Sequence, residues 1–223
     1  TYKYDDFDKS GSSYTLKGNI PHYVSESNTQ PGMPKYKDLN GDGVIDTNDR
    51  TMIGRGLPIH TGGFTNNFEY KGFDLSVFFQ WSYGNDVLNA NRLFFDSGFQ
   101  KKRELNQYAS YTDRWTPENP NSNIPAATNS SSNLVISSRV VEDASFLRLK
   151  TVTLGYTVPK TFLKKYKIDN ARLYVAAQNL WTITGYSGYD PEVSIRSGGL
   201  TPGLDFSSYP RALSVSFGIN LGF

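Results

Sequence analysis

A run of acidic and amide residues between Asp38 and Asp49 has the spacing of a twelve-residue calcium-binding loop. In such loops oxygen ligands stand at the first, third, fifth, seventh, ninth and twelfth positions, the seventh being a backbone carbonyl. Gly43 stands at the sixth position, where the chain turns sharply. Hard cations prefer oxygen ligands, so we expect one structural Ca²⁺. The candidate ligands are Asp38, Asn40, Asp42, the carbonyl of Val44, Asp46 and Asp49.

The loop departs from the common form at its last ligand. Asp49 stands where a bidentate glutamate is usual, and its side chain has a shorter reach. The loop in this respect resembles those of dockerins. Leu39 and Ile45 are its apolar residues, and we expect both to point into the fold. A solvated turn of Asp and Asn residues without an ion is the alternative.

Other residues offer little chemistry. His22 and His60 have no metal-ligand spacing, and the chain has no cysteine. Patterns for a nucleophile elbow, a phosphate-binding loop or a dinucleotide-binding turn are absent from the sequence. Asp190 and Glu192 could be imagined as a glycosidase pair, but spacing alone cannot support that. We therefore predict no catalytic residues and no enzyme activity.

Five segments alternate apolar with polar or small residues, a pattern that favours β-strands with two different faces. The clearest covers residues 213–223, about the length of a tilted strand that crosses a bilayer. The other four segments cover residues 64–70, 73–81, 146–158 and 173–181. Aromatic residues stand near the strand ends, as membrane interfaces favour: Tyr70, Trp81, Tyr83, Tyr156 and Trp181.

The connections between these segments alternate in length. Lys71 and Gly72 form a two-residue turn, and residues 159–170 form a short connection with a helical turn at 161–166. Residues 84–145 and 182–212 form long connections, the first with helical spacing at 86–95 and Asp86 as its N-cap. Short periplasmic turns and long extracellular loops are typical of outer-membrane barrels.

We therefore predict an all-β fold made of strands from a large antiparallel transmembrane barrel with long extracellular loops. Five strands are too few, since natural barrels need about eight, so the chain is expected to be part of a longer protein. Residues 1–60 form an extracellular region with the calcium loop at 38–49, and residues 61–223 form the strands with loops 84–145 and 182–212. A net charge of +2 gives no support for a nucleic-acid partner.

Several motifs occur in an order that resembles a known family. They are PGMPKYKDLNGDG at 31–43, DRTMIG at 49–54, YKGFDLSVFFQ at 70–80, YGND at 83–86, FLRLK at 146–150, TLGY at 153–156, AQNL at 177–180, GYDPE at 188–192 and GLD at 203–205. From about residue 30 to residue 223, the chain resembles the C-terminal part of the SusC/RagA family of TonB-linked outer-membrane proteins of Bacteroidetes.

The resemblance implies a large barrel in the bacterial outer membrane with an N-terminal plug that this chain lacks. It implies import of a polar oligomeric substrate, either a glycan, an oligosaccharide or a peptide. The implied partners are a SusD-like surface lipoprotein, outer-membrane lipid, and TonB acting through the N-terminal part of the protein.

Substrate-binding residues are expected on the long loops. Aromatic rings there could stack on sugars or pack the loops together. The candidates are Tyr108, Tyr111, Trp115, Tyr186, Tyr189 and the acidic Asp190.

A secreted calcium-binding all-β module that binds glycans is the alternative function, although a dockerin would need two calcium loops. A hydrolase is a third alternative, but the sequence contains no set of catalytic residues that supports it. Dependence on detergent would separate a barrel segment from a secreted module.

Overall fold

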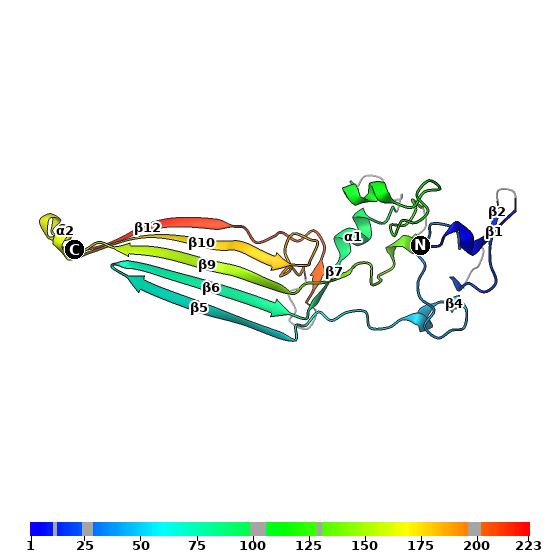
Figure 1. Cartoon of the computed structure of the whole chain (residues 1–223), viewed down its shortest axis with the longest axis horizontal. Coiled ribbons are helices and arrows are strands. Elements are labelled where there is room, and N and C mark those ends of the chain that lie inside the picture. Colours follow the sequence, from blue (N-terminus) through cyan, green and yellow to red (C-terminus); the bar gives the residue numbers. More distant parts are fainter. Residues whose placement is uncertain (11–12, 24–28, 99–105, 129–130, 196–201) are drawn as a thin grey trace. The chain divides into compact units, whose positions relative to one another are not determined.

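The computed structural model describes residues 1–10, 13–23, 29–98, 106–128, 131–195 and 202–223 of the 223-residue chain. These residues form two compact units, and Figure 1 labels several of their elements. The first unit consists of Thr1–Ile53 and Asn89–Val141, and the second of Gly54–Leu88 and Glu142–Phe223. No helix in the described residues is long and apolar enough to cross a membrane.

The first unit holds short elements around a small aromatic core. Its elements are η1 (Tyr4–Asp6), β1 (Phe7–Ser10), β2 (Ser13–Leu16), β3 (His22–Tyr23), β4 (Val44–Ile45), η3 (Thr47–Asp49), α1 (Ala90–Phe95), η5 (Ala109–Asp113) and η6 (Ser131–Leu134), where η marks a 3₁₀ helix. β1 pairs with β2 in antiparallel fashion, and β3 pairs with β4 in parallel. The buried core side chains are Tyr2, Phe7, Leu16 and Ile45.

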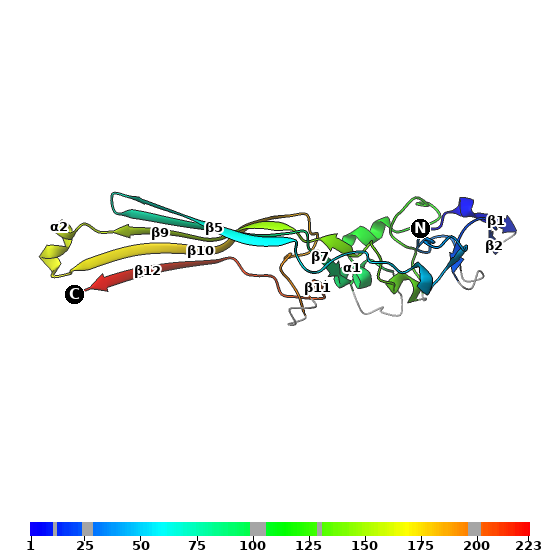
Figure 2. The same ribbon diagram turned by 90° about the horizontal axis from the view of Figure 1, so that it is seen from below.

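A five-stranded antiparallel sheet forms the body of the second unit (Figure 1). Its strands are β5 (His60–Tyr70), β6 (Phe73–Tyr83), β9 (Phe146–Thr157), β10 (Asn170–Thr184) and β12 (Ser214–Gly222). They lie in the order β12-β10-β9-β6-β5, which leaves β5 and β12 at open edges. Figure 2 shows these strands as one twisted layer. All five predicted strands are confirmed, and β5, β6 and β10 are longer than predicted.

Alternation along the strands gives the sheet one apolar and one polar face. The register places apolar residues opposite one another, since directly opposed residues share a face. Leu75 of β6 is opposite Leu154 of β9, which is opposite Val175 of β10. Val175 is in turn opposite Phe217 of β12, whose side chain is 82% exposed. The other face carries small and polar residues, among them Ser76, Thr153, Ala176 and Ser216.

A one-residue bulge in β9 changes which side chains reach each face. Thr151 is opposite Phe78, but the next opposed pair is Leu149 with Phe79, so Lys150 is the extra residue. An extra residue reverses the alternation beyond it. Leu149 therefore lies on the apolar face and Arg148 on the polar face, whereas unbroken alternation from Val152 would have placed Arg148 among the apolar residues.

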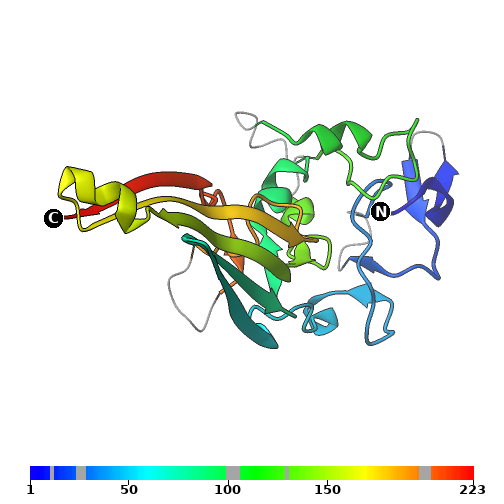
Figure 3. The same cartoon turned by 60° about the vertical axis from the view of Figure 1, so that its left-hand side comes forward.

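The connections follow the predicted lengths. In the turn between β5 and β6, Lys71 and Gly72 both have positive φ, 47° and 86°, which suits a tight hairpin turn. The connection between β9 and β10 contains α2 (Lys160–Leu163) and η7 (Lys164–Tyr166), in agreement with the predicted helical turn. Figure 3 shows these helical turns beyond the ends of β9 and β10.

The long connections contain a second, small sheet. Its strands are β7 (Asp86–Asn89), β8 (Val141–Asp143) and β11 (Leu204–Asp205), in the order β11-β7-β8. The predicted helix at 86–95 is therefore wrong in its first turn. The helix begins at Ala90, and its N-cap is Asn89, whose Oδ1 accepts a hydrogen bond from the backbone N–H of Arg92 at 3.2 Å. Residues 99–105, 129–130 and 196–201 of these loops lie outside the described residues.

Candidate functional site

The polar face of the large sheet carries an ion pair that spans three strands. Arg172 of β10 donates two hydrogen bonds to Asp74 of β6, from Nε at 3.0 Å and from Nη2 at 2.5 Å. The intervening strand, β9, has Gly155 at this level, and any side chain there would collide with both partners. The absence of a side chain on Gly155 therefore lets two non-adjacent strands interact directly.

Arg148 forms a buried ionic cluster at the opposite end of the same face. Its guanidinium donates to Asp190 at 2.6 Å and lies 2.9 Å from Glu192, and its side chain is only 3% exposed. Lys150 and Arg211 contact Glu192 more loosely, at 3.6 Å and 3.5 Å. Because buried charges are stable only when paired, this cluster ties the segment around Asp190 to strand β9.

The environment of Asp190 keeps it ionised. Burial alone would raise the pKa of its carboxyl group, but hydrogen bonds outweigh that effect. Asp190 accepts from Arg148 and from the backbone N–H groups of Glu192 and Arg211, at 3.0 Å and 3.1 Å for the last two. Together with the positive charge of Arg148, these bonds hold the pKa of Asp190 below its usual value. Asp190 and Glu192 are thus bound to cations rather than arranged as a hydrolytic pair.

A cavity of about 340 Å³ lies beside this cluster. Ser208 Oγ is buried and has no hydrogen-bond partner among the described residues, whereas Tyr209 is 91% exposed. Arg211 is half exposed and contributes its guanidinium to the same wall. The cavity therefore offers an aromatic ring and a cation. Its lining residues are Asp190, Glu192, Val193, Ser194, Ile195, Ser208, Tyr209 and Arg211.

The predicted aromatic residues of loop 182–212 have contrasting positions. Tyr186 is 5% exposed, and its hydroxyl donates to Asp205 at 2.6 Å, so it belongs to the packing of the loop. Tyr189 is 87% exposed and presents its ring to the surroundings. Tyr189 therefore has the exposure that a ligand-binding ring needs, whereas Tyr186 does not.

The aromatic candidates of loop 84–145 lie in the first unit and mostly pack within it. Trp115 is 7% exposed, and its ring lies 5.2 Å from that of Tyr4. Tyr111 is half-buried, and burial raises the pKa of its hydroxyl. Tyr108 is exposed, but its ring packs edge-on against Phe95 at 5.6 Å. Trp115 and Tyr111 thus serve the packing of the unit.

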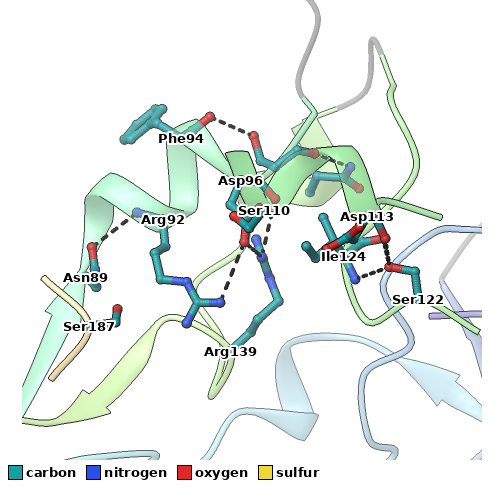
Figure 4. A network of polar contacts seen from close by, with 12 residues as sticks. Asn89, Arg92, Phe94, Asp96, Ser110, Asp113, Ser122, Ile124, Arg139 and Ser187 are labelled. Carbon is teal, nitrogen blue, oxygen red and sulfur yellow. Dashed lines mark hydrogen bonds and ion pairs between the residues drawn. The ribbon is translucent and has the colours of Figure 1, made fainter. Parts of the chain in front are cut away.

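A polar network that the sequence did not reveal stabilises the same loop (Figure 4). Asp96 is fully buried and contacts Arg139 at 3.4 Å and Arg92 at 3.6 Å. Ser110 donates to the other carboxylate oxygen at 3.2 Å, and Asn133 donates to the carbonyl of Ser97 at 2.6 Å. Burial lowers the pKa of Arg139, an effect that the charge of Asp96 opposes. These contacts hold Asp96, Ser97, Ser110, Asn133 and Arg139 together in the part of the loop that the structure describes.

The candidate calcium loop closes on itself through its acidic side chains. Asp38 accepts from the backbone N–H groups of Gly41 and Gly43 at 2.7 and 2.9 Å, and Asp42 accepts from that of Val44 at 2.8 Å. Asp49 accepts from the N–H groups of Asp46 and Leu39, which hold its pKa below the usual range. Gly41 and Gly43 have φ of 78° and 85°, which confirms the predicted sharp turn at Gly43.

The donor chemistry of this loop fits a hard cation, although its carboxylates are turned toward the backbone of the loop. Among the described residues, no group of three or more His, Cys, Asp or Glu side chains is gathered so that it could hold a metal ion. A carboxylate has about four acceptor positions, so these hydrogen bonds leave capacity for a cation. Ile45 is buried as predicted, but the prediction for Leu39 is wrong, because it is 44% exposed.

Curated relatives match the chain over most of its length. TonB-dependent receptor P3 of Formosa agariphila is 38% identical over 213 residues, which cover 92% of this chain and 21% of that protein. TonB-dependent receptor SusC of Bacteroides thetaiotaomicron is 28% identical over 201 residues, which cover 90% of this chain and 18% of that protein. No protein-family profile matches the chain.

Solved structures show the same arrangement of elements. A structure of the RagAB peptide transporter matches with a TM-score of 0.69 and 28% identity, over 86% of this chain and 20% of that chain. The 'open-open' state of the RagAB peptide importer matches with a TM-score of 0.66 over 98% of this chain. The chain spans about a fifth of the length of these proteins. Its strands are therefore part of a large antiparallel transmembrane β-barrel, and the chain belongs to the SusC/RagA family of TonB-dependent receptors.

Proposed function

We propose that the chain forms part of the wall and the extracellular loops of an outer-membrane importer for polar oligomers. The observation that carries this proposal is the five-stranded sheet, which has an exposed apolar face and a polar face and matches the RagAB transporter structures. An apolar outer face suits lipid, and a polar inner face suits an aqueous lumen. The relatives are receptors and transporters, so we propose import without catalysis.

The proposed orientation follows from the connections. The turn at Lys71 and Gly72 and the connection through α2 are short, whereas the connections with β7, β8 and β11 are long. Short turns favour the periplasmic side and long loops the extracellular side. Residues 1–60, with the calcium loop, then belong to the extracellular side as well. The cavity beside Arg148 would open near the extracellular mouth of the barrel.

The proposed partners are a SusD-like surface lipoprotein, which would meet the extracellular loops, and TonB, which would act on a part of the receptor outside this chain. The names of the relatives, SusC and RagAB among them, support both partners. The substrate class we propose is an oligosaccharide or a peptide. Tyr189, with its exposed ring, and the cavity lined by Tyr209 and Arg211 are the contacts that we assign to it.

Substitution of Tyr189 tests the proposed substrate contact in the full-length receptor that contains this chain. Tyr189→Ser should lower uptake of labelled oligosaccharide or peptide at subsaturating concentration by about threefold to tenfold, the effect of one lost ring contact. Tyr189→Phe, which keeps the ring, is the matched control and should transport normally. Wild-type uptake by Tyr189→Ser at equal outer-membrane levels would remove Tyr189 from the site.

We further propose that the loop at 38–49 binds one structural Ca²⁺. The supporting observations are the oxygen donors, the positive φ of Gly41 and Gly43, and the ionised Asp49. The ion would supply a fixed positive charge that holds the acidic side chains together. Asp38, Asn40, Asp42, Asp46 and Asp49 would hold it through their side chains, and Val44 through its carbonyl.

Calorimetry with calcium on the full-length receptor tests this site. The wild type should bind one more calcium ion than a variant with Asp38→Ala and Asp42→Ala, and calcium should raise the melting temperature of the wild type but not that of this variant. Asp5→Ala with Asp8→Ala, two acidic residues of the same unit outside the loop, is the matched control. Equal calcium stoichiometry in all three proteins would show that the loop is a metal-free turn.

A further inference from the structure

The connection between β9 and β10 has a concentrated positive charge. From Pro159 to Ile168 the sequence contains four lysines and no acidic residue. The side chains of Lys160, Lys164, Lys165 and Lys167 are all exposed. None of the four forms an ion pair in the part of the chain that the structure describes. This segment, Lys160–Lys167, is called the lysine turn below.

The backbone holds the lysine turn firmly against the end of the sheet. Leu163 is 7% exposed and anchors α2, and the N–H of Ile168 donates to the Leu163 carbonyl at 3.4 Å. The N–H of Val158 donates to Ala171 of β10 at 2.9 Å, and that of Asp169 donates to Gly222 of β12 at 2.8 Å. The four ammonium groups are therefore presented from a fixed scaffold, which lowers the entropic cost of binding a partner.

Exposed aromatic rings accompany these charges. Phe162 and Tyr166 of the lysine turn are 70% and 67% exposed. At the same end of the sheet, Tyr156 packs against Phe73 with 4.5 Å between ring centroids. Lys71 of the neighbouring turn lies over the ring of Tyr70 at 5.1 Å. Figure 1 shows that the β5–β6 turn and α2 lie at the same end of the strands.

Exposed lysines beside exposed aromatic rings match the chemistry of a negatively charged membrane surface. Aromatic rings favour the level of lipid headgroups, where an apolar ring and its polar edge are both accommodated. Lysines gain free energy near anionic phosphates, and the gain increases with each added charge. No acidic residue lies between Lys160 and Ile168, and the exposed Asp169 that follows leaves four lysines against one carboxylate in this connection. The turn therefore complements a negatively charged membrane surface.

We propose that the lysine turn binds anionic glycerophospholipids of the leaflet that surrounds the short-turn end of the barrel. Phe162 and Tyr166 enter the interface, and the ammonium groups contact the lipid phosphates. The proposal rests on the transmembrane placement given under the proposed function. It adds an anionic lipid as a binding partner of the barrel. It also gives the connection between β9 and β10 a role beyond joining the two strands.

A charge-removal variant of the full-length receptor tests the proposal. Lys160, Lys164 and Lys165 are changed to Gln together, while Lys167 keeps its left-handed backbone with φ of 55° undisturbed. The matched control changes Lys3, Lys9 and Lys37 of the first unit to Gln, which removes the same charge elsewhere. Native mass spectrometry in detergent measures binding of phosphatidylglycerol, with phosphatidylcholine as the neutral lipid.

The wild type and the control should bind phosphatidylglycerol in preference to phosphatidylcholine, and the lysine-turn variant should lose about tenfold or more of that preference. About 0.5 M salt should weaken phosphatidylglycerol binding by the wild type, because exposed charges are screened. Wild-type phosphatidylglycerol binding by the lysine-turn variant, or binding that is insensitive to salt, would overturn the proposal. The proposal would also be overturned if the lysine-turn variant lost binding to lipopolysaccharide but kept wild-type binding to phosphatidylglycerol.

The outcome is separable from the proposed function. A receptor that reaches the outer membrane and imports substrate normally, but whose lysine-turn variant binds phosphatidylglycerol like the wild type, contradicts only the lipid contact. A receptor that is absent from the outer membrane fraction contradicts the proposed function, whatever lipid it binds in detergent.

Discussion

Arg148 determines the position of a loop that follows it by more than forty residues. Its guanidinium binds Asp190, 42 residues later in the chain, and Glu192 beyond it. A bidentate cation between two carboxylates is a directional arrangement, because the planar guanidinium fixes where each acid must lie. All three side chains are buried or nearly so. The position of Asp190 and Glu192 in the cavity wall therefore depends strongly on Arg148.

Replacing Arg148 by Met should destabilise the loop strongly. Two carboxylates would remain in a buried place without their main partner, and breaking such a pair costs about 3–5 kcal/mol. Hydrogen exchange of residues 186–195 in the full-length receptor measures the loss of protection. Arg211→Met is the matched control, and since that side chain is half exposed its loss should cost less than about 1 kcal/mol. Equal protection in both variants would mean that Arg148 does not hold the loop.

The ionisation of Asp190 predicts how this loop responds to acid. Its pKa in the folded protein lies below the usual value, so its contribution to stability is present above the unfolded pKa of about 3.9. That contribution is lost as the pH falls through the lower, folded pKa. Protection of residues 186–195 should therefore be constant from neutral pH to about 5 and decrease below about 4. Loss of protection already near pH 6 would contradict this ionisation.

At the scale of the strand, β9 shows what the sequence could and could not predict. The alternation of Val152, Leu154 and Tyr156 predicted a strand and its faces correctly. The apolar positions shift by one residue at Leu149 and Leu147, and that shift is the signal of the bulge at Lys150. Its consequence, Arg148 on the polar face, follows once the bulge is recognised.

The apolar face of β12 gives a test at the level of one element. Val215, opposite Ala177, lies on the apolar face, and Val215→Arg should destabilise the membrane-inserted protein by about 2–4 kcal/mol. Urea titration of the receptor folded into lipid vesicles measures this change. Ser216→Arg, opposite Ala176 on the polar face, is the neighbouring control and should be tolerated. Equal stability of the two variants would argue against a lipid-facing side.

Elements held by distant contacts were beyond sequence reasoning. Residues 86–89 have helical spacing, but they form β7 because β11 and β8 offer hydrogen-bonding edges on both sides. Arg139 contacts Asp96, which lies 43 residues earlier in the chain, and no local sequence pattern predicts such a contact. In the candidate site, Tyr189 and Tyr186 look alike in the sequence, but Tyr186 is buried and bonded to Asp205 whereas Tyr189 is exposed. The strands were predictable because alternation is local, whereas the loops depend on long-range pairing.

At the scale of the whole molecule, the second unit exposes what a closed barrel would cover. Among the described residues, β5 and β12 have one unpaired edge each, and large apolar side chains such as Phe217 and Ile219 are well exposed. Open strand edges and large apolar surfaces promote association in water. These surfaces are consistent with a chain that spans about a fifth of its relatives, whose other strands would complete the wall.

The isolated 223-residue chain should therefore aggregate in detergent-free buffer and become dispersed in mild detergent. Size-exclusion chromatography with and without detergent measures this difference. The control is the chain with Phe217 and Ile219 changed to Ser, which should aggregate less. A monomeric wild-type chain in plain buffer would favour the secreted calcium-binding module instead.

The ion pair between Asp74 and Arg172 carries a consequence for assembly. The two residues are 98 positions apart, and their strands are separated by β9, so neither can reach the other through sheet pairing alone. They meet only above Gly155, once β9 is hydrogen-bonded on both sides and all three strands are in register. A shift of β9 by one residue would move Gly155 away and put Leu154 or Tyr156 in the path of the pair. Formation of the pair thus marks the point at which this part of the wall has assembled in the correct register.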